Sequence, residues 1–435
     1  MNRLAVAAER RAANLAQNYG RAINLSAGCA VLPLPVLKQA QKNFLDTRDL
    51  GLSVTEMGYR TRNFHVEMEE AEASFRKLLN IPTETHEVHF FNGGATLQFA
   101  AIPMNLLGRA VKHDGGKSQK LACNYIMNGH WSEKSRNEAK LFQELLPNLE
   151  VNEVTDCPLQ KNLFFSLSND YERDWKFLKT TTQDEEINKK TPTSSRKAVY
   201  THYTAADTRQ GFEFHDFPYE IVPKDQILAC DASANLGSKP IDVSKYGVLY
   251  AAAHKNFSTS GVCYTIIRKA LLEENAVLPG TPTMCNWWKF QTADNKIYNV
   301  PVIFAIWLGK LTTNWMLEQG GLQFFDELAK TRANVLYNFI DNECEQFYST
   351  FVTDPKFRSR MNIVFTIGDG QTGRNPELVA KFLQETSEDL GWLDIRSHPL
   401  GIDSDAIRVT TYNAQTLETV QIVRDFMQDF WKRHR

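Results

Sequence analysis

The sequence predicts an α/β protein whose large domain is a mainly parallel sheet covered by helices. Between residues 86 and 268, segments typical of a strand alternate with segments typical of a helix. The expected strands, such as residues 247–253, are apolar throughout and lack the alternation of a half-exposed strand. Strands of this kind are buried on both faces, as in parallel sheets between two helical layers. Residues that carry out chemistry in such sheets lie at the carboxyl ends of the strands.

The composition disfavours several classes of protein. The chain carries 49 Lys and Arg against 51 Asp and Glu, which argues against nucleic acid as a partner. Its 7 cysteines are scattered without CxxC spacing, which favours a reducing compartment and argues against a metal site. The apolar run at residues 302–308 is far shorter than the roughly 20 residues of a membrane helix. We expect a cytoplasmic protein with no membrane partner, although the arginine-rich start leaves organellar import open.

A small-residue segment follows the first expected strand. That strand, at residues 87–91, runs into NGGAT at 92–96 and then into a helix. Small residues before a helix let backbone N–H groups close on a phosphate, and the helix dipole favours the negative charge. A tight turn alone also needs glycine. Gly94, Ala95 and Thr96 are therefore candidate phosphate-binding positions if other residues support this chemistry.

The next strand and helix place an aromatic ring beside a glycine. The segment LACNYIMNGHWSEKSRNEAK is typical of a strand, a turn and a helix, with Trp131 at the helix start. A tryptophan there usually packs, but its flat surface can also stack on a cofactor ring. Residues 133–200 are less regular, and their Thr- and Lys-rich part predicts a surface loop. Thr208 follows near the end of another strand.

The segment at residues 245–264 supplies the main evidence for a catalytic function. An apolar strand delivers His254 and Lys255, and burial would lower the pKa of this lysine and free its amine to attack a carbonyl. A single lysine in this place is more often a surface residue. Asp231, however, ends another apolar strand, at residues 226–230. A carboxylate and a lysine at neighbouring strand ends suit pyridoxal 5'-phosphate, because they serve its ring nitrogen and its aldehyde carbon.

The last third of the chain predicts helices and a second sheet. Residues 302–318 and 322–345 are expected to be helices separated by two glycines. MNIVFTIG and AIRVTTYNA are expected strands, and Thr416 is expected to cap a final helix. We therefore predict an N-terminal arm over residues 1–35, a large cofactor-binding domain over 36–305, and connecting helices with a small α+β domain over 306–435.

Several stretches resemble the phosphoserine aminotransferase family, a class V branch of the fold-type I pyridoxal phosphate transferases. They cover nearly the whole chain, in order, and they include SAGCAVLPLPVLKQAQ, GLSVTEMGYRTRNF, FFNGGATLQFAAIPMNLL, NGHWSEKSRNEAK, YNVP and AIRVTTYNA. The resemblance implies a homodimer with shared active sites that acts on a small amino acid and a 2-oxo acid. It also implies that Arg408 binds the substrate α-carboxylate and that Asn299 reaches the other subunit's site.

The resemblance further implies a set of cofactor-binding residues. Lys255 would form the Schiff base, Asp231 would pair with the ring nitrogen, and Trp131 would stack on the ring. Thr208 would lie near the ring oxygen, with Ser233 near the phosphate. The full expected set is Lys255, Asp231, Trp131, Thr208, Ser233, His254, Gly94, Ala95, Thr96 and Asn299.

The expected substrate-binding residues Arg408, Arg60, His398 and Tyr59 include departures from the family. Tyr59 stands before Arg60 where the family usually has histidine, and Pro399 follows His398 where it has arginine. Other departures are His254 for glutamine, Val300 for threonine and Thr96 for an arginine found in many members.

Proline offers neither charge nor donor, so the loss of one charged partner at residue 399 would weaken phosphate binding roughly 10- to 150-fold. Arg209, Arg396 and Lys239 are candidates to compensate.

The favoured function is an aminotransferase in which Lys255 is the Schiff base and then the general base. The best guess for its amino-acid substrates is the pair O-phosphoserine and glutamate. One alternative keeps the cofactor but uses an unphosphorylated amino acid, by transamination or by elimination. Another is a catalytically silent dimeric binding protein, which the presence of Lys255, Asp231 and Trp131 disfavours. A nucleotide-binding protein is disfavoured because the glycine fingerprints are missing.

Overall fold

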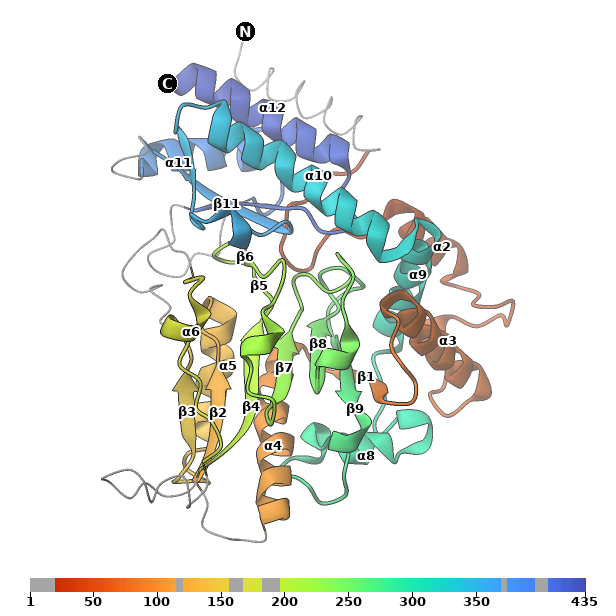
Figure 1. The fold of residues 1–435 in the computed structure, drawn as a ribbon. Coiled ribbons are helices and arrows are strands. Elements are labelled where there is room, and N and C mark those ends of the chain that lie inside the picture. Colours follow the sequence, from red (N-terminus) through yellow and green to blue (C-terminus); the bar gives the residue numbers. More distant parts are fainter. Residues whose placement is uncertain (1–19, 115–119, 156–166, 182–195, 369–373, 396–405) are drawn as a thin grey trace.

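The computed structural model describes residues 20–114, 120–155, 167–181, 196–368, 374–395 and 406–435 (Figure 1). Residues 1–19 of the predicted N-terminal arm, most of the Thr- and Lys-rich loop, and Arg396, His398 and Pro399 lie outside these residues.

A sheet of seven strands forms the centre of the larger part of the molecule, in the order β1-β9-β8-β7-β4-β2-β3. Its strands are β1 (His86–Asn92), β2 (Lys120–Tyr125), β3 (Glu150–Glu153), β4 (Arg196–Thr204), β7 (Ile227–Asp231), β8 (Val248–Ala252) and β9 (Val262–Arg268). All pairings from β3 to β8 are parallel, whereas β9 is antiparallel to both β8 and β1. The predicted mainly parallel sheet is confirmed. The antiparallel strand arises because residues 253–261 are too short for the crossover that a parallel pair requires.

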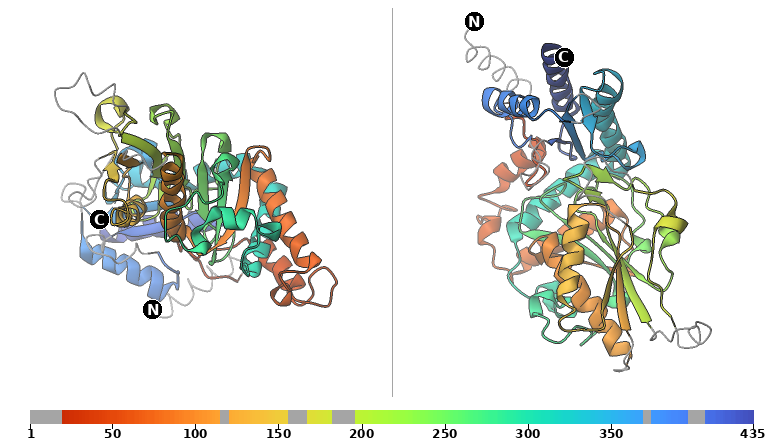
Figure 2. Two further views of the ribbon diagram at one scale, coloured as in Figure 1. Left: turned by 90° about the horizontal axis from the view of Figure 1, so that it is seen from below. Right: turned by 90° about the vertical axis from the view of Figure 1, so that its left-hand side faces the viewer.

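The helices lie around this sheet and over a second, smaller one. Their bounds are α2 (Leu34–Asn43), α3 (Arg62–Leu79), α4 (Ala95–Asp114), α5 (His130–Leu141), α6 (Tyr171–Asp174), α8 (Trp287–Gln291), α9 (Ile303–Glu318), α10 (Gly321–Asn342), α11 (Pro376–Leu383) and α12 (Leu417–His434). Figures 1 and 2 both show α3 beyond the β1 edge of the large sheet, with β3 at the opposite edge. The helix α3 ends at a left-handed Asn80 cap, before Pro82.

The strand β8 of the large sheet supplies two hydrophobic cores. Leu249 and Ala251 of β8 pack in one core with residues of α3 and α9, such as Phe75. Val248 and Tyr250 pack on the other face with residues of α4 and α5. Because alternate residues enter opposite cores, the strand is apolar throughout, as its sequence indicated.

The C-terminal part forms a three-stranded antiparallel sheet of β10 (Tyr348–Thr350), β11 (Asn362–Ile367) and β12 (Ile407–Thr410). Figure 1 shows α10 and α12 running beside each other over β11, and Leu336 and Phe430 share their core. The hydroxyl of Thr416 accepts the Thr419 N–H at 3.1 Å, so the predicted cap of α12 is confirmed. The domain boundary at 305/306 stays a prediction; α9 contributes Ile306 to the large-sheet core.

A short hairpin joins the two sheets. It consists of β5 (Ala206–Asp207) and β6 (Phe212–Glu213). The fully buried Glu213 forms an ion pair with Arg360 at 2.8 Å, just before β11. The Ser359 N–H also donates to the carbonyl of Gly211 at 2.7 Å. These contacts fix the loop around Thr208 relative to the strand that carries Arg408.

Candidate active site

Lys255 and Asp231 lie at the carboxyl ends of neighbouring parallel strands. Asp231 is the last residue of β7 and is in register with Tyr250 of β8, which leads to Lys255. Lys255 is only 8% exposed, and this burial lowers the pKa of its ammonium group, against the opposing charges of Asp231 and Asp207. A lysine with a lowered pKa supplies the neutral amine that can attack a carbonyl.

The Asp231 carboxylate is itself buried and held in place. It accepts the N–H of Ser233 at 2.9 Å, and burial raises its pKa against the opposing charge of Lys255. The hydroxyl of Ser233 accepts the Ala252 N–H at 2.9 Å, which ties the end of β8 to the end of β7.

Trp131 faces the lysine from the start of α5. The Lys255 Nζ atom lies 5.7 Å from the centroid of the Trp131 ring. The indole N–H donates to the Thr208 hydroxyl at 3.0 Å, and the backbone N–H donates to Asp207 at 2.9 Å. Both bonds fix the orientation of a flat aromatic wall beside the reactive amine.

Asp207 is a site residue that our sequence analysis missed. It is fully buried, burial raises its pKa, and its carboxylate accepts backbone N–H groups of Trp131, Arg209 and Gln210. A Cβ atom on Gly129 would collide with this carboxylate, so glycine is required there. The sequence signal was the Asp-x-x-x-Gly turn after the strand, since aspartate often accepts nearby backbone N–H groups.

Arg408 reaches this loop from the smaller sheet. It lies on β12, is 6% exposed, and donates from Nη1 to the Thr208 carbonyl at 3.3 Å. Its guanidinium lies 3.6 Å from Asp394. Burial lowers its pKa, but arginine remains charged at physiological pH. The structure thus brings Lys255, Asp231, Trp131, Thr208 and Arg408 into one site across both sheets.

Gly94, Ala95 and Thr96 form the expected turn at the start of α4. Gly93 has φ +98°, a conformation that favours glycine, and its N–H donates to the Gly261 carbonyl at 2.9 Å. A Cβ atom on Gly94 would meet nothing within 4 Å, so the space beside this helix start is open. The turn lies at the same edge of the sheet as Lys255, because β1 and β8 both run antiparallel to β9.

His254 packs against the N-terminal segment around Gly28. A Cβ atom on Gly28 would lie 2.6 Å from its ring, and its carbonyl accepts the Ala30 N–H at 2.9 Å. Burial, followed by the charge of Lys255, lowers the pKa of His254 to about 4. The imidazole is therefore neutral at physiological pH.

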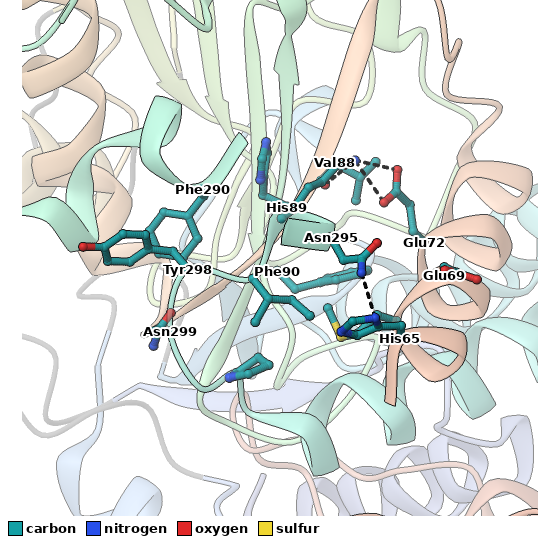
Figure 3. Close-up of a pocket in the computed structure, with 14 residues that line it drawn as sticks. His65, Glu69, Glu72, Val88, His89, Phe90, Phe290, Asn295, Tyr298 and Asn299 are labelled. Atoms are coloured by element: carbon teal, nitrogen blue, oxygen red, sulfur yellow. Dashed lines mark hydrogen bonds and ion pairs between the residues drawn. The ribbon is translucent and has the colours of Figure 1, made fainter. Parts of the chain in front are cut away.

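In the part of the chain that the structure describes, the contacts of Tyr59, Arg60 and Asn299 are with residues other than Lys255, Asp231 and Trp131. Arg60 is exposed and stacks on Tyr59, in the loop before α3. Asn299 lies at the rim of a separate pocket of about 130 Å³ between α3 and residues 290–301 (Figure 3). There Asn295 and His65 are joined at 2.7 Å, and Lys296 binds Glu72 at 3.0 Å.

The comparisons with known proteins agree with this geometry. A model of the aminotransferase class-V family matches residues 178–388. The chain is 34% identical to the phosphoserine aminotransferase of Acinetobacter baylyi over 95% of this chain and 99% of that protein. The chain belongs to the phosphoserine aminotransferase family. A probable phosphoserine aminotransferase of Dictyostelium discoideum is 32% identical over 96% of this chain and 99% of its own length.

Solved structures of phosphoserine aminotransferases share the fold over nearly the whole chain. That of Bacillus circulans subsp. alkalophilus has a TM-score of 0.77 and 30% identity, covering 95% of this chain and 99% of its own. A PLP-bound one from Trichomonas vaginalis has a TM-score of 0.78 and 32% identity, covering 94% of this chain and 100% of its own. The predicted fold-type I architecture is confirmed, and the protein is a pyridoxal phosphate-dependent aminotransferase acting on small molecules.

The residues present fit this cofactor. A buried carboxylate, Asp231, suits a protonated ring nitrogen, and the amine of Lys255 faces the Trp131 ring. The open space at Gly94 beside the start of a 20-residue helix suits a phosphate. In the described residues, neither a cluster of possible metal ligands nor a helix able to cross a membrane is found.

Proposed function

We propose that this enzyme transfers the amino group of O-phosphoserine to 2-oxoglutarate, forming glutamate, and that it catalyses the reverse reaction. The observation that carries the proposal is the buried amine of Lys255 between Asp231 and Trp131, with Arg408 bound to the same loop. Relatives named phosphoserine aminotransferase, matched over nearly their whole length, support the choice of substrate.

Each residue of the site has a role that follows from its position. When bound, pyridoxal phosphate supplies the aldehyde carbon that accepts the amino group and the protonated ring that withdraws electrons. Asp231 would hold the proton at the ring nitrogen, and Trp131 would orient the ring. The neutral Nζ of Lys255, favoured by its lowered pKa, would take a proton from the substrate Cα and return it.

Arg408 and the two hydroxyl residues would orient the reactants. The planar fork of Arg408 suits bidentate binding of the substrate α-carboxylate. The hydroxyl of Thr208 accepts the indole N–H and can donate its own proton toward the cofactor ring. Ser233, Ala95 and Thr96 would hold the cofactor phosphate, through the serine hydroxyl and the backbone N–H groups at the start of α4.

We further propose that the active form is a homodimer. Arg60 is exposed, and the exposed apolar residues Tyr298 and Val300 flank Asn299, which supports this because such a surface suits contact with a second copy. We also propose a reducing compartment, most simply the cytoplasm. In the described residues, Cys29, Cys123, Cys230, Cys263, Cys285 and Cys344 are free thiols, which supports that choice.

The test is product analysis with purified holoenzyme, O-phosphoserine and 2-oxoglutarate. We expect one glutamate for each phosphoserine consumed, with no reaction in the absence of 2-oxoglutarate beyond a single turnover. Sustained release of inorganic phosphate or ammonia without 2-oxoglutarate would instead identify an elimination reaction and contradict the proposal.

A further inference from the structure

Arg209 has no role in the site described so far, although it follows Thr208 directly. It is 9% exposed, and its backbone N–H donates to Asp207 at 2.8 Å. Its guanidinium Nη1 donates to the Nδ1 atom of His130 at 2.9 Å. Since arginine has only donors, the His130 ring accepts at Nδ1 and therefore carries its proton on Nε2.

This pair is built onto the aromatic wall of the site. His130 is the first residue of α5, and its ring meets the Trp131 ring at 5.1 Å with the planes at 70°. The Trp131 ring in turn faces the Lys255 amine. Arg209, His130, Trp131 and Lys255 are thus linked in series, each side chain beside the next.

Two arginines therefore flank the same residue. Arg408 donates to the carbonyl of Thr208, and Arg209 is the next residue in the chain. Burial lowers the pKa of Arg408, and the charge of Arg209 lowers it further, against the opposing charge of Asp394. Two buried guanidinium groups, one held at the Thr208 carbonyl and one on the next residue, favour an anionic ligand beside them.

Of the other two candidate cations, Arg396 lies outside the described residues, and Lys239 has partners away from Lys255. The Lys239 ammonium donates to the carbonyls of Phe214 and His215. It lines a separate cavity of about 720 Å³ with Asp326 and Arg358, beside α10. Of Arg209 and Lys239, only Arg209 has contacts with the residues around Lys255.

Resting on the function proposed above, we propose that Arg209, positioned by His130, binds the distal anionic group of the substrate while Arg408 binds its α-carboxylate. The site then selects amino acids with a second acidic group, whether a phosphate monoester or a side-chain carboxylate. Phosphoserine and glutamate share this feature, so one cation would serve both halves of the reaction. Arg209 becomes a specificity-determining residue, and His130 becomes a positioning residue.

The test compares three amino donors in the single-turnover reaction of the holoenzyme, followed by the cofactor absorbance. O-phosphoserine and glutamate carry a distal anion, and alanine does not. We expect Arg209→Met to lower kcat/KM for phosphoserine and glutamate by about 10- to 100-fold and to change that for alanine by less than about threefold. Arg209→Lys should recover part of the loss, since it restores the charge but not the fork. Inorganic phosphate should also compete with phosphoserine about tenfold less well in Arg209→Met.

Further variants separate binding from folding. His130→Asn should raise KM for the two acidic donors with little change in kcat, because it releases Arg209 without removing it. Arg424→Gln, on the outer helix α12, is the matched control and should change nothing. Should Arg209→Met fail to fold, Arg209→Lys and His130→Asn carry the test.

An equal loss for alanine and phosphoserine, or no loss for phosphoserine, would overturn the role of Arg209. A wild-type enzyme that uses glutamate and not phosphoserine would instead overturn the proposed substrate, and glutamate would still test Arg209.

Discussion

The amine of Lys255 lies 5.7 Å from the centroid of the Trp131 ring, although one follows a strand and the other begins a helix. The ring is oriented by its hydrogen bond to Thr208, which is held in turn by Arg408 of the smaller sheet. The reactive amine, the aromatic wall and the proposed carboxylate-binding residue are therefore linked by direct contacts.

The Trp131–Thr208 bond provides the first prediction. Thr208→Val keeps the shape of the side chain but removes the acceptor of the indole N–H, which leaves a partly buried donor unpaired. We expect cofactor affinity to fall about 5- to 30-fold, in line with a cost of about 1–2 kcal/mol for such a bond. Titration of the apoenzyme with pyridoxal phosphate measures this. Thr331→Val, on the exposed surface of α10, is the control, and equal affinities for both variants would contradict the prediction.

The variant Asp231→Asn should keep the fold but lose most of the activity. The amide has nearly the same shape and can still accept the Ser233 N–H, so the thermal midpoint should change little. The asparagine amide carries no negative charge to keep the cofactor ring nitrogen protonated, and the ring withdraws electrons less well as a result. We expect kcat to fall at least about 100-fold. A variant with kcat within a few fold of the wild type would show that Asp231 does not serve the ring.

The Glu213–Arg360 ion pair should stabilise the junction of the two sheets. Glu213 is fully buried, and the variant Glu213→Gln leaves Arg360 with less compensation for its charge. Breaking a buried pair costs about 3–5 kcal/mol, and urea unfolding at pH 7 measures the loss. Glu385→Gln, which removes the partly exposed pair with Arg433, is the control and should cost less than about 1 kcal/mol.

The same pair predicts a dependence of stability on pH. Burial alone would raise the pKa of Glu213, but the charges of Arg360, His215 and Lys239 outweigh it and lower the pKa to about 2. A depressed carboxyl pKa stabilises the fold above the unfolded value of about 4.3, and this stabilisation is lost as the pH falls toward 2. The difference between wild type and Glu213→Gln should therefore shrink from pH 6 to pH 3. A difference that stays constant over this range would be inconsistent with an ionised Glu213.

The dimer is tested through Asn299 and Arg60. If each reaches the other subunit's site, inactive Lys255→Ala subunits mixed with inactive Arg60→Ala subunits should form some hybrid dimers with one intact site. We expect up to about a quarter of the wild-type activity to return on mixing under conditions of subunit exchange. A strictly monomeric enzyme with full activity at assay concentration would refute the shared site.

The residues near strand ends were predictable because the signal is local. The apolar strands before Asp231 and Lys255 show both their burial and their ends, and a parallel sheet brings such ends to one edge. The turn before α4 was predictable for the same reason, since glycine and a helix start are adjacent in the sequence. The antiparallel direction of β9 was missed, although the short connection after β8 contains that information.

The contacts between distant segments could not be predicted in this way. Asp207 accepts a bond from Trp131, and Arg209 donates one to His130, across a separation of more than 70 residues in each case. Glu213 meets Arg360 only because the hairpin packs against the smaller sheet. Such pairs depend on tertiary packing, which no local pattern specifies.

The central claim is that Lys255 holds the cofactor, and borohydride reduction of the holoenzyme tests it most directly. Reduction converts the C=N bond between the lysine and the cofactor into a stable link, which proteolysis and mass spectrometry can locate. We predict a single modified peptide containing Lys255, loss of activity in proportion to labelling, and no labelling of Lys255→Ala. A cofactor attached to Lys239, Lys310 or any other lysine would contradict the account.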